Sequence, residues 1–206
     1  MSKTPGALSL LAVAACLAAA MPAQAATPVF INEIHYDNDG IDANEFVEIA
    51  GPAGTDLSGW SVVFYNGNGG GVYATQNLAG TLPDAGDGMG MIAVYQPGIQ
   101  NGSPDGLALV DTNTSKVAQF LSYEGSFTAA DGPAKDMAST DIGVSQSGST
   151  SGDSLQLKGT GKVYEDFTWA DTSPATPGTV NTGQSFSESV SSAHGSLQGI
   201  RFLLLK

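Results

Sequence analysis

The sequence has little of what most enzymes and nucleic-acid-binding proteins use. Its 206 residues contain one cysteine, two histidines and seven lysines and arginines, against 20 aspartates and glutamates, so the formal net charge is −13. Cys16, the one cysteine, lies in an apolar N-terminal run, and the chain after it can form neither a disulfide nor a thiol site. The cations between residues 27 and 186 are Lys116, Lys135, Lys158 and Lys162. Such a surface repels phosphate backbones, so we do not expect direct binding of DNA or RNA.

The scarcity of histidine also argues against catalysis. His35 is the only histidine in the predicted folded part, since His194 lies in the C-terminal tail. One histidine without a second His or Cys makes a poor zinc site. The sequence has no H-E-x-x-H and no G-x-S-x-G, and its glycine run at 67–71 lacks the Lys-Ser/Thr ending of a phosphate loop. We therefore predict that this chain is not an enzyme and has no catalytic residues.

Residues 1–25 have the pattern of a signal peptide. Lys3 supplies a positive start, an apolar run extends from Leu8 to Met21, and Ala23 to Ala25 form a small-x-small cleavage site. The apolar run is short for a membrane span. The alternative is a lipoprotein signal at Val13 to Cys16, although the residues after the cysteine stay apolar. Cleavage after residue 25 predicts a secreted, periplasmic or extracellular protein without a transmembrane span in its mature chain.

Short β-rich segments separated by turn residues fill the chain from residue 30 to residue 171. We predict about nine strands, at 30–36, 45–50, 60–65, on the far arm of a hairpin turning at 66–71, and at 88–95, 106–111, 116–125, 154–159 and 164–171. No long segment has helical apolar spacing with caps. This rhythm is typical of an all-β antiparallel sandwich, which we place at 27–183.

Three segments interrupt that rhythm. Residues 125–152 predict an irregular excursion over one end of the sandwich. The proline-containing stretch 173–183 is predicted to leave the domain, because proline lacks the donor that a central strand needs. Residues 184–206 are polar and serine-rich before a short apolar end, and we predict a disordered tail there.

The acidic loop between the first two predicted strands is the only metal-site candidate. It contains Asp37, Asp39, Asp42 and Glu45 with a glycine among them, a set of oxygen ligands suited to Ca²⁺. The spacing departs from the EF-hand loop, whose glycine position would be occupied by Asp42. The alternative is a strand connection that uses Asp, Asn and Gly to form turns. Both interpretations stay open on the sequence.

Two more acidic residues, Glu33 and Glu48, lie inside predicted strands. They lie among β-branched and aromatic residues, and we predict that they bind backbone amides or neighbouring hydroxyl groups rather than act in catalysis. Trp60 and Trp169 are the largest apolar anchors and are predicted to pack in the core.

Several motifs together resemble a known family. They include FINEIHYDN, EFVEI, DLSGWSVVFYNG, GSPDGLALVD, QFLSYEG and a closing W-x6-TPG-x2-N at 169–181. In this combination the chain is similar to the lamin tail domain, which also occurs in secreted bacterial proteins, some of them nucleases. The resemblance implies an immunoglobulin-like β-sandwich used for binding or attachment, without catalytic residues.

These observations lead to three hypotheses. The first is an exported, non-enzymatic module of lamin-tail type that binds a surface, a polymer or another protein. The second is an accessory domain of an extracellular metal-dependent DNA or RNA endonuclease, present without its catalytic part in a truncated or frame-shifted form. The third is a structural domain stabilised by calcium.

Overall fold

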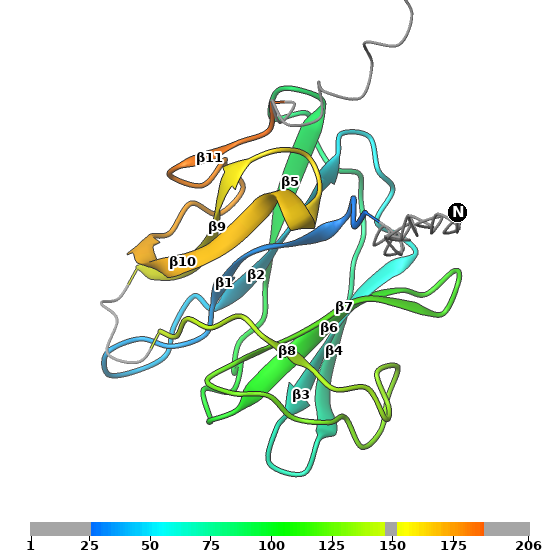
Figure 1. Cartoon of the computed structure of the whole chain (residues 1–206), viewed down its shortest axis with the longest axis vertical. Helices are drawn as coiled ribbons and strands as arrows, with labels where there is room; N and C mark the ends of the chain where they lie inside the picture. The colour runs from blue at the N-terminus through cyan, green and yellow to red at the C-terminus, as the bar shows by residue number, and fades with distance from the viewer. Residues whose placement is uncertain (1–25, 147–151, 188–206) are drawn as a thin grey trace, which may run out of the picture.

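Two β-sheets packed face to face form the protein (Figure 1). The computed structural model describes residues 26–146 and 152–187. The first sheet contains β1 (Phe30–His35), β2 (Phe46–Pro52), β5 (Met89–Tyr95), β9 (Asp153–Thr160), β10 (Phe167–Pro174) and β11 (Gln184–Ser185). The second contains β3 (Trp60–Asn66), β4 (Gly71–Asn77), β6 (Asp105–Asp111), β7 (Lys116–Tyr123) and β8 (Thr140–Asp141).

The sheet order brings together strands that are distant in the sequence. The first sheet runs β10-β9-β1-β2-β5, with β11 beside β9, and the second runs β4-β3-β6-β7-β8. All pairs are antiparallel except those of the two-residue strands β8 and β11. The predicted all-β sandwich is therefore confirmed. A short 3-10 helix at Tyr164–Asp166 replaces the start of the last predicted strand, and no helix in the described ranges is long and apolar enough to cross a membrane.

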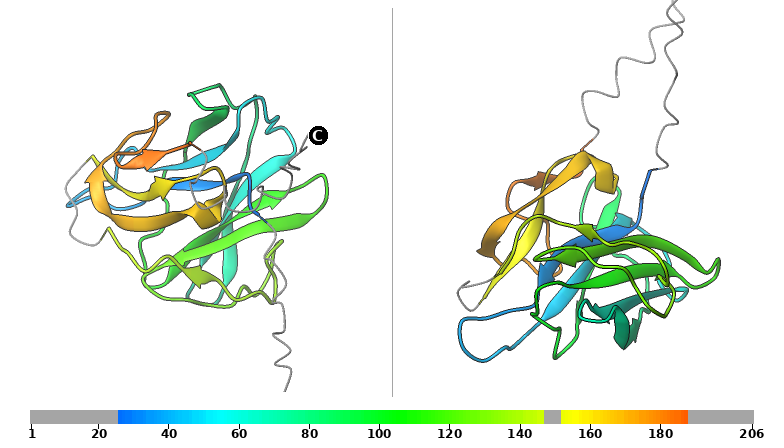
Figure 2. Two further views of the ribbon diagram at one scale, coloured as in Figure 1. Left: turned by 45° about the horizontal axis from the view of Figure 1, so that its top comes forward. Right: turned by 60° about the horizontal axis from the view of Figure 1, so that its bottom comes forward.

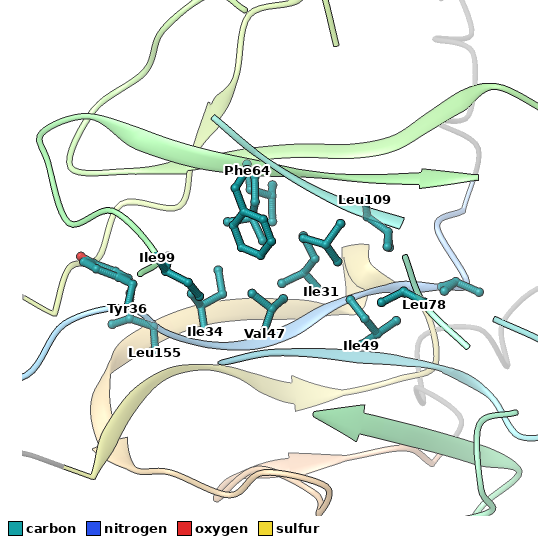
Figure 3. Packing of buried hydrophobic residues seen from close by; sticks show 14 of the residues in the cluster. Ile31, Ile34, Tyr36, Val47, Ile49, Phe64, Leu78, Ile99, Leu109 and Leu155 are labelled. Atoms are coloured by element: carbon teal, nitrogen blue, oxygen red, sulfur yellow. The ribbon is translucent and has the colours of Figure 1, made fainter. Parts of the chain in front are cut away.

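The core lies between the inner faces of the two sheets (Figure 3). Ile31 and Val47 of the first sheet pack in one cluster with Phe64 and Leu109 of the second, and all four are at most 1% exposed. Strand β1 has an irregular register between Ile31 and Glu33, consistent with a β-bulge that inserts a residue into the strand. After the bulge the side chains of β1 alternate: Ile34 points into the core between the sheets, and Glu33 and His35 point to the outer face of the first sheet.

A returning segment covers the outer face of the first sheet (Figure 2). Residues 174–187 run back along this face, where the amide of Asn181 donates to the carbonyls of Asn32 and Leu157, both at 3.1 Å. Phe186 is buried and its ring lies edge-on to Phe167 at 5.8 Å. The prediction that 173–183 leaves the domain is wrong, because its polar groups pair with buried groups of the sheet.

The same contacts carry the fold past the predicted boundary at residue 183. Gln184 and Ser185 form β11, and the buried Phe186 follows them. Residues 188–206 of the predicted tail and residues 1–25 of the predicted signal peptide lie outside the described residues.

A second segment covers the outer face of the second sheet. Residues 127–139 lie over β3, β6 and β7, where Phe127 packs edge-on to Phe120 at 5.3 Å. Tyr65 holds the segment by accepting a hydrogen bond from the backbone N–H of Ala134 at 3.0 Å. The excursion predicted over one end of the sandwich therefore covers a sheet face instead, because its apolar residues match the apolar outer face.

Both tryptophans lie at the margin of the core. Trp60 and Trp169 are half-buried and pack against the main cluster. The indole N–H of Trp169 donates to the Tyr164 hydroxyl at 3.1 Å, which satisfies its one polar atom.

Candidate functional site

Hydrogen bonds join three loops at one end of the sandwich. They are the β1–β2 loop (36–45), the β3–β4 turn (67–70) and the β5–β6 loop (96–104), and together we call them the loop end. Asn101 of the β5–β6 loop donates to two carboxylates of the β1–β2 loop. Asp105, where β6 begins, accepts from the β3–β4 turn. These contacts hold the three loops together at this end of the sandwich.

Asp105 is the central residue of this arrangement. It is 3% exposed, and its Oδ1 accepts from the Gly67 N–H at 2.9 Å while its Oδ2 accepts from the Gly102 N–H at 2.6 Å. Gly67 lies so close to the carbonyl of Pro104 that a Cβ there would stand 2.0 Å from its oxygen. A glycine is therefore needed at this position, and the carboxylate holds the β3–β4 turn against the β5–β6 loop.

Two tyrosines, the half-buried Tyr73 and the buried Tyr123, fix the backbone of Gln100. Its N–H donates to the Tyr73 hydroxyl at 2.9 Å, and its carbonyl accepts from the Tyr123 hydroxyl. Burial raises the pKa of Tyr73 to about 12, so this hydroxyl stays protonated across the physiological range. The two hydrogen bonds therefore fix the β5–β6 loop at its midpoint. A loop that is already ordered costs less conformational entropy when a ligand binds.

A polar pocket of about 670 Å³ lies over these supports. Its lining is rich in side-chain amides: Asn66, Asn68, Gln100 and Asn101, together with Ser103 and backbone of the two loops. The one charged residue in the lining is Asp105, and both of its oxygens already accept backbone N–H groups. An amide offers both donors and an acceptor. The pocket can therefore bind uncharged groups that themselves donate and accept hydrogen bonds.

The predicted calcium ligands are only partly brought together. Asp37 Oδ1 and Asp42 Oδ2 both lie near the Asn101 amide nitrogen, at 3.2 Å and 3.5 Å. Asp42 Oδ1 also accepts from the Asn38 N–H at 3.1 Å, which closes a turn within the loop. Asp39 is exposed.

Glu45, the fourth predicted ligand, is 4% exposed. Its Oε2 accepts from the Gly98 N–H at 2.6 Å, and its Oε1 is buried with no hydrogen-bond partner. Burial is the main cause that raises the pKa of this carboxyl above its usual value. Within residues 26–146 and 152–187, no three His, Cys, Asp or Glu side chains are grouped to hold a metal ion. Calcium binding here stays a prediction.

His35 acts as part of the support of the acidic loop. Its Nε2 lies 3.2 Å from the carbonyl oxygen of Ala43, and its Nδ1 lies 3.0 Å from Nε2 of the fully buried Gln146. These contacts fit a neutral ring that donates from Nε2 and accepts at Nδ1. Gln146 Oε1 accepts in turn from the Tyr36 N–H at 2.5 Å. Both ring nitrogens therefore contact groups of the protein itself.

Glu33 and Glu48 lie apart from the loop end, on the outer face of the first sheet. Glu33 accepts from the Thr176 N–H at 2.8 Å and its hydroxyl at 3.0 Å, and Glu48 accepts from the Gly178 N–H at 2.6 Å. Neither side chain is exposed. The prediction that they bind backbone amides and hydroxyls is confirmed. Burial raises the pKa of Glu48 to about 8.

The sequence reasoning missed the residues that build the pocket. Asn68, Gln100 and Asn101 have no local signal, because an isolated amide in a loop does not show what it contacts. Asp105 does have a local sequence signal, because S-P-D-G is a turn pattern immediately before a strand.

The DLSGW motif forms a tight turn at the other end of the sandwich. Asp56 accepts from the Ser58 N–H at 2.9 Å, Leu57 is fully buried, and Gly59 leaves room for the Asn113 side chain. Each residue of the motif thus has a structural role. Comparisons with family models, curated proteins and solved structures returned no match.

Proposed function

We propose that this protein is an exported, non-enzymatic binding module similar to the lamin tail domain, with an immunoglobulin-like sandwich. Its ligand is an uncharged polymer rich in hydroxyl or amide groups, held at the loop end. The observation that carries the proposal is the amide-lined pocket above a support of buried hydrogen bonds. Its volume lies within the range of ligand pockets, about 300–1,000 Å³.

The positions of the motif residues support the family. Glu48 belongs to EFVEI, and Gly178 and Asn181 belong to the closing TPG-x2-N. Glu48 binds Gly178, and Asn181 binds the backbone of β1 and β9. Motifs that are 130 residues apart in sequence thus serve one structural purpose, as expected of a fold signature rather than an active site.

The engagement of the titratable groups supports a role without catalysis. Both nitrogens of His35 contact the protein itself. The carboxylates of Glu33 and Asp105 accept backbone N–H groups with one or both oxygens. A general base needs a nitrogen or oxygen that can reach a substrate proton, and these groups are already used to hold loops.

The charge distribution favours an uncharged ligand. The chain has a net charge of −13 and the pocket lining has no cation. A polyanion such as DNA would meet repulsion without a compensating contact. Sugar hydroxyls and amides instead match the mixed donors and acceptors of asparagine and glutamine.

A binding assay on neutral polysaccharides tests the proposal. Cellulose, chitin and mannan are incubated with the full chain, with an Asn68→Ala/Gln100→Ala double variant, and with Asn113→Ala as an amide control at the opposite end. We expect at least one polysaccharide to retain the wild type and the control, with at least a tenfold loss in the double variant. Equal retention of all three proteins, or none of any, contradicts the proposed site.

A nuclease assay tests the absence of catalysis. The full chain and a His35→Ala variant are incubated with double-stranded DNA in Mg²⁺ or Ca²⁺. We expect no degradation by either. Degradation by the wild type that is lost in His35→Ala would contradict the binding-module proposal and favour the nuclease hypothesis.

A further inference from the structure

One lateral side of the sandwich is formed by strands that contain no charged residue. These are the edge strands β4 and β5, and we call this side the neutral side. Between residues 57 and 104 the only charged residues are Asp84 and Asp87, in the loop before β5. A pocket of about 230 Å³ opens between the two edges, lined in part by Leu57, Leu78 and Ile92. In a chain with 20 acidic residues, this is a marked local exclusion of charge.

Strand β5 has an unprotected edge. In the described part of the chain it pairs only with β2, and its sequence MGMIAVY contains no proline and no charge. At its start the edge is occupied, because Met89 exchanges backbone hydrogen bonds with Ala85 and Gly86. The edge is therefore accessible from about Ile92 to Tyr95, because Met91 is only 1% exposed whereas Tyr95 is 57% exposed. An uncharged strand edge of this kind is a template for pairing with another strand.

The other edge strands carry the usual protections. β8 consists of two residues, Thr140 and Asp141. β10 contains Asp171, ends at Pro174 and has an irregular register before Ser173. Short length, charge, proline and bulges are the means by which proteins prevent edge pairing. Strand β5 has none of these protections along its accessible edge.

We propose that a second copy of this chain pairs with β5, strand against strand and antiparallel, to form a homodimer with a continuous sheet. Two copies with a net charge of −13 each repel one another wherever acidic surfaces meet, and the neutral side lets them approach without that repulsion. Pairing centred on Ala93 places Ile92 opposite Val94 of the second copy. Cross-strand pairs of this apolar kind are favourable.

β4, the neighbouring edge, is less suited to this role. Its start is covered, because the Val72 N–H donates to Asp131 at 2.8 Å. Its exposed residues are the polar Thr75 and Asn77. Thr75 therefore provides a matched control position on the same side of the molecule.

Sedimentation velocity over a micromolar dilution series tests the dimer with the full chain. We expect a wild-type dimer that dissociates on dilution, a monomer for Tyr95→Lys, and an unchanged dimer for Thr75→Lys. Circular dichroism of each variant establishes that it is folded. A wild type that stays monomeric throughout overturns the proposal and leaves the edge to an extended segment of another protein.

Cross-linking provides a second readout that does not depend on the lysine variants. In a Cys16→Ser background, Ala93→Cys would place two thiols opposite each other, at a Cα separation of about 4.5–5.5 Å that a disulfide can bridge. We expect a covalent dimer after mild oxidation of Ala93→Cys and none for Thr75→Cys. A dimer that cross-links through residue 75, or fails to cross-link through residue 93, overturns β5 pairing.

Discussion

The outer faces of the two sheets are both covered by an irregular segment, but the chemistry of the two covers differs. Residues 174–187 are fastened to the first sheet through buried polar groups, with Glu33 and Glu48 accepting from Thr176 and Gly178. Residues 127–139 are fastened to the second sheet mainly by apolar packing, with Phe127 against Phe120.

The two segments thus exclude water from the outer face of a sheet in two different ways. A buried polar network leaves several groups without partners when one member is removed, so its loss is abrupt. Apolar packing loses stability in proportion to the area and cavity involved. The polar cover also depends on protonation, while the apolar cover does not. Each of these contrasts can be measured.

Removal of the Glu33 carboxylate has the largest expected effect. Glu33→Ala leaves the Thr176 N–H and the Ser154 hydroxyl without their acceptor, while the Thr176 hydroxyl keeps Asn181 Oδ1 at 3.0 Å. We expect a loss of about 3–5 kcal/mol in the free energy of unfolding. Chemical denaturation measures this loss, and Glu33→Gln, which keeps one acceptor oxygen, is expected to lose less. A loss below that of Phe127→Ala would contradict the contrast between the covers.

Truncation of Phe127 tests the apolar cover. The side chain is half-buried, and its ring contacts Tyr65 and Phe120. We expect Phe127→Ala to lower the free energy of unfolding by about 2 kcal/mol, less than for a fully buried phenylalanine. Phe127→Leu keeps most of the packing and should lose less. Equal losses for both variants would show that the cover is not held by apolar area.

The pH dependence of stability separates the two covers. The pKa of Glu48 is raised to about 8 in the folded protein from 4.5, mainly by burial. The folded state therefore holds a proton that the unfolded state releases, and stability falls as pH rises between these values, by at most about 1.4 kcal/mol per pH unit. Denaturation at pH 5 and pH 8 measures the fall. Glu48→Gln should flatten it and Phe127→Ala should not, and an equal slope in both would contradict this origin.

Calcium is expected to have the smallest effect. If Asp37, Asp39, Asp42 and Glu45 bind calcium, millimolar Ca²⁺ raises the melting midpoint, with a stabilisation of about 1.4 kcal/mol at tenfold excess over Kd. Thermal melts with Ca²⁺ and with Mg²⁺ measure it, and Asp42→Asn should remove the shift. An unchanged midpoint in the wild type contradicts the calcium prediction and leaves the loop as a turn.

The strands were predictable because their local chemistry matches their structure. EFVEIA and WSVVFY carry β-branched and aromatic residues between turn signals, and they became β2 and β3. The buried roles of Glu33 and Glu48 were also predictable, since a carboxylate within an apolar strand needs donors. The covering segments were not, because Glu33, the partner of Thr176, and Tyr65, a partner of Phe127, are far away in sequence.

The candidate site was less predictable than the fold. The acidic loop drew attention through its carboxylates, yet the pocket is lined mainly by amides such as Asn68 and Gln100. Amides in loops are common and carry no spacing signature. Asp105 is acidic but serves as a support, which only its two backbone contacts reveal.

The central claim is that buried carboxylates such as Glu33 and Asp105 support the structure while an uncharged surface binds the ligand. The most direct test of this claim is the salt dependence of binding to the polysaccharide that retains the most wild-type protein. An uncharged ligand held by side-chain amides predicts a dissociation constant that is nearly constant as the salt concentration rises. A dissociation constant that increases steeply with the salt concentration, as in the binding of a polyanion that releases counterions, would contradict it.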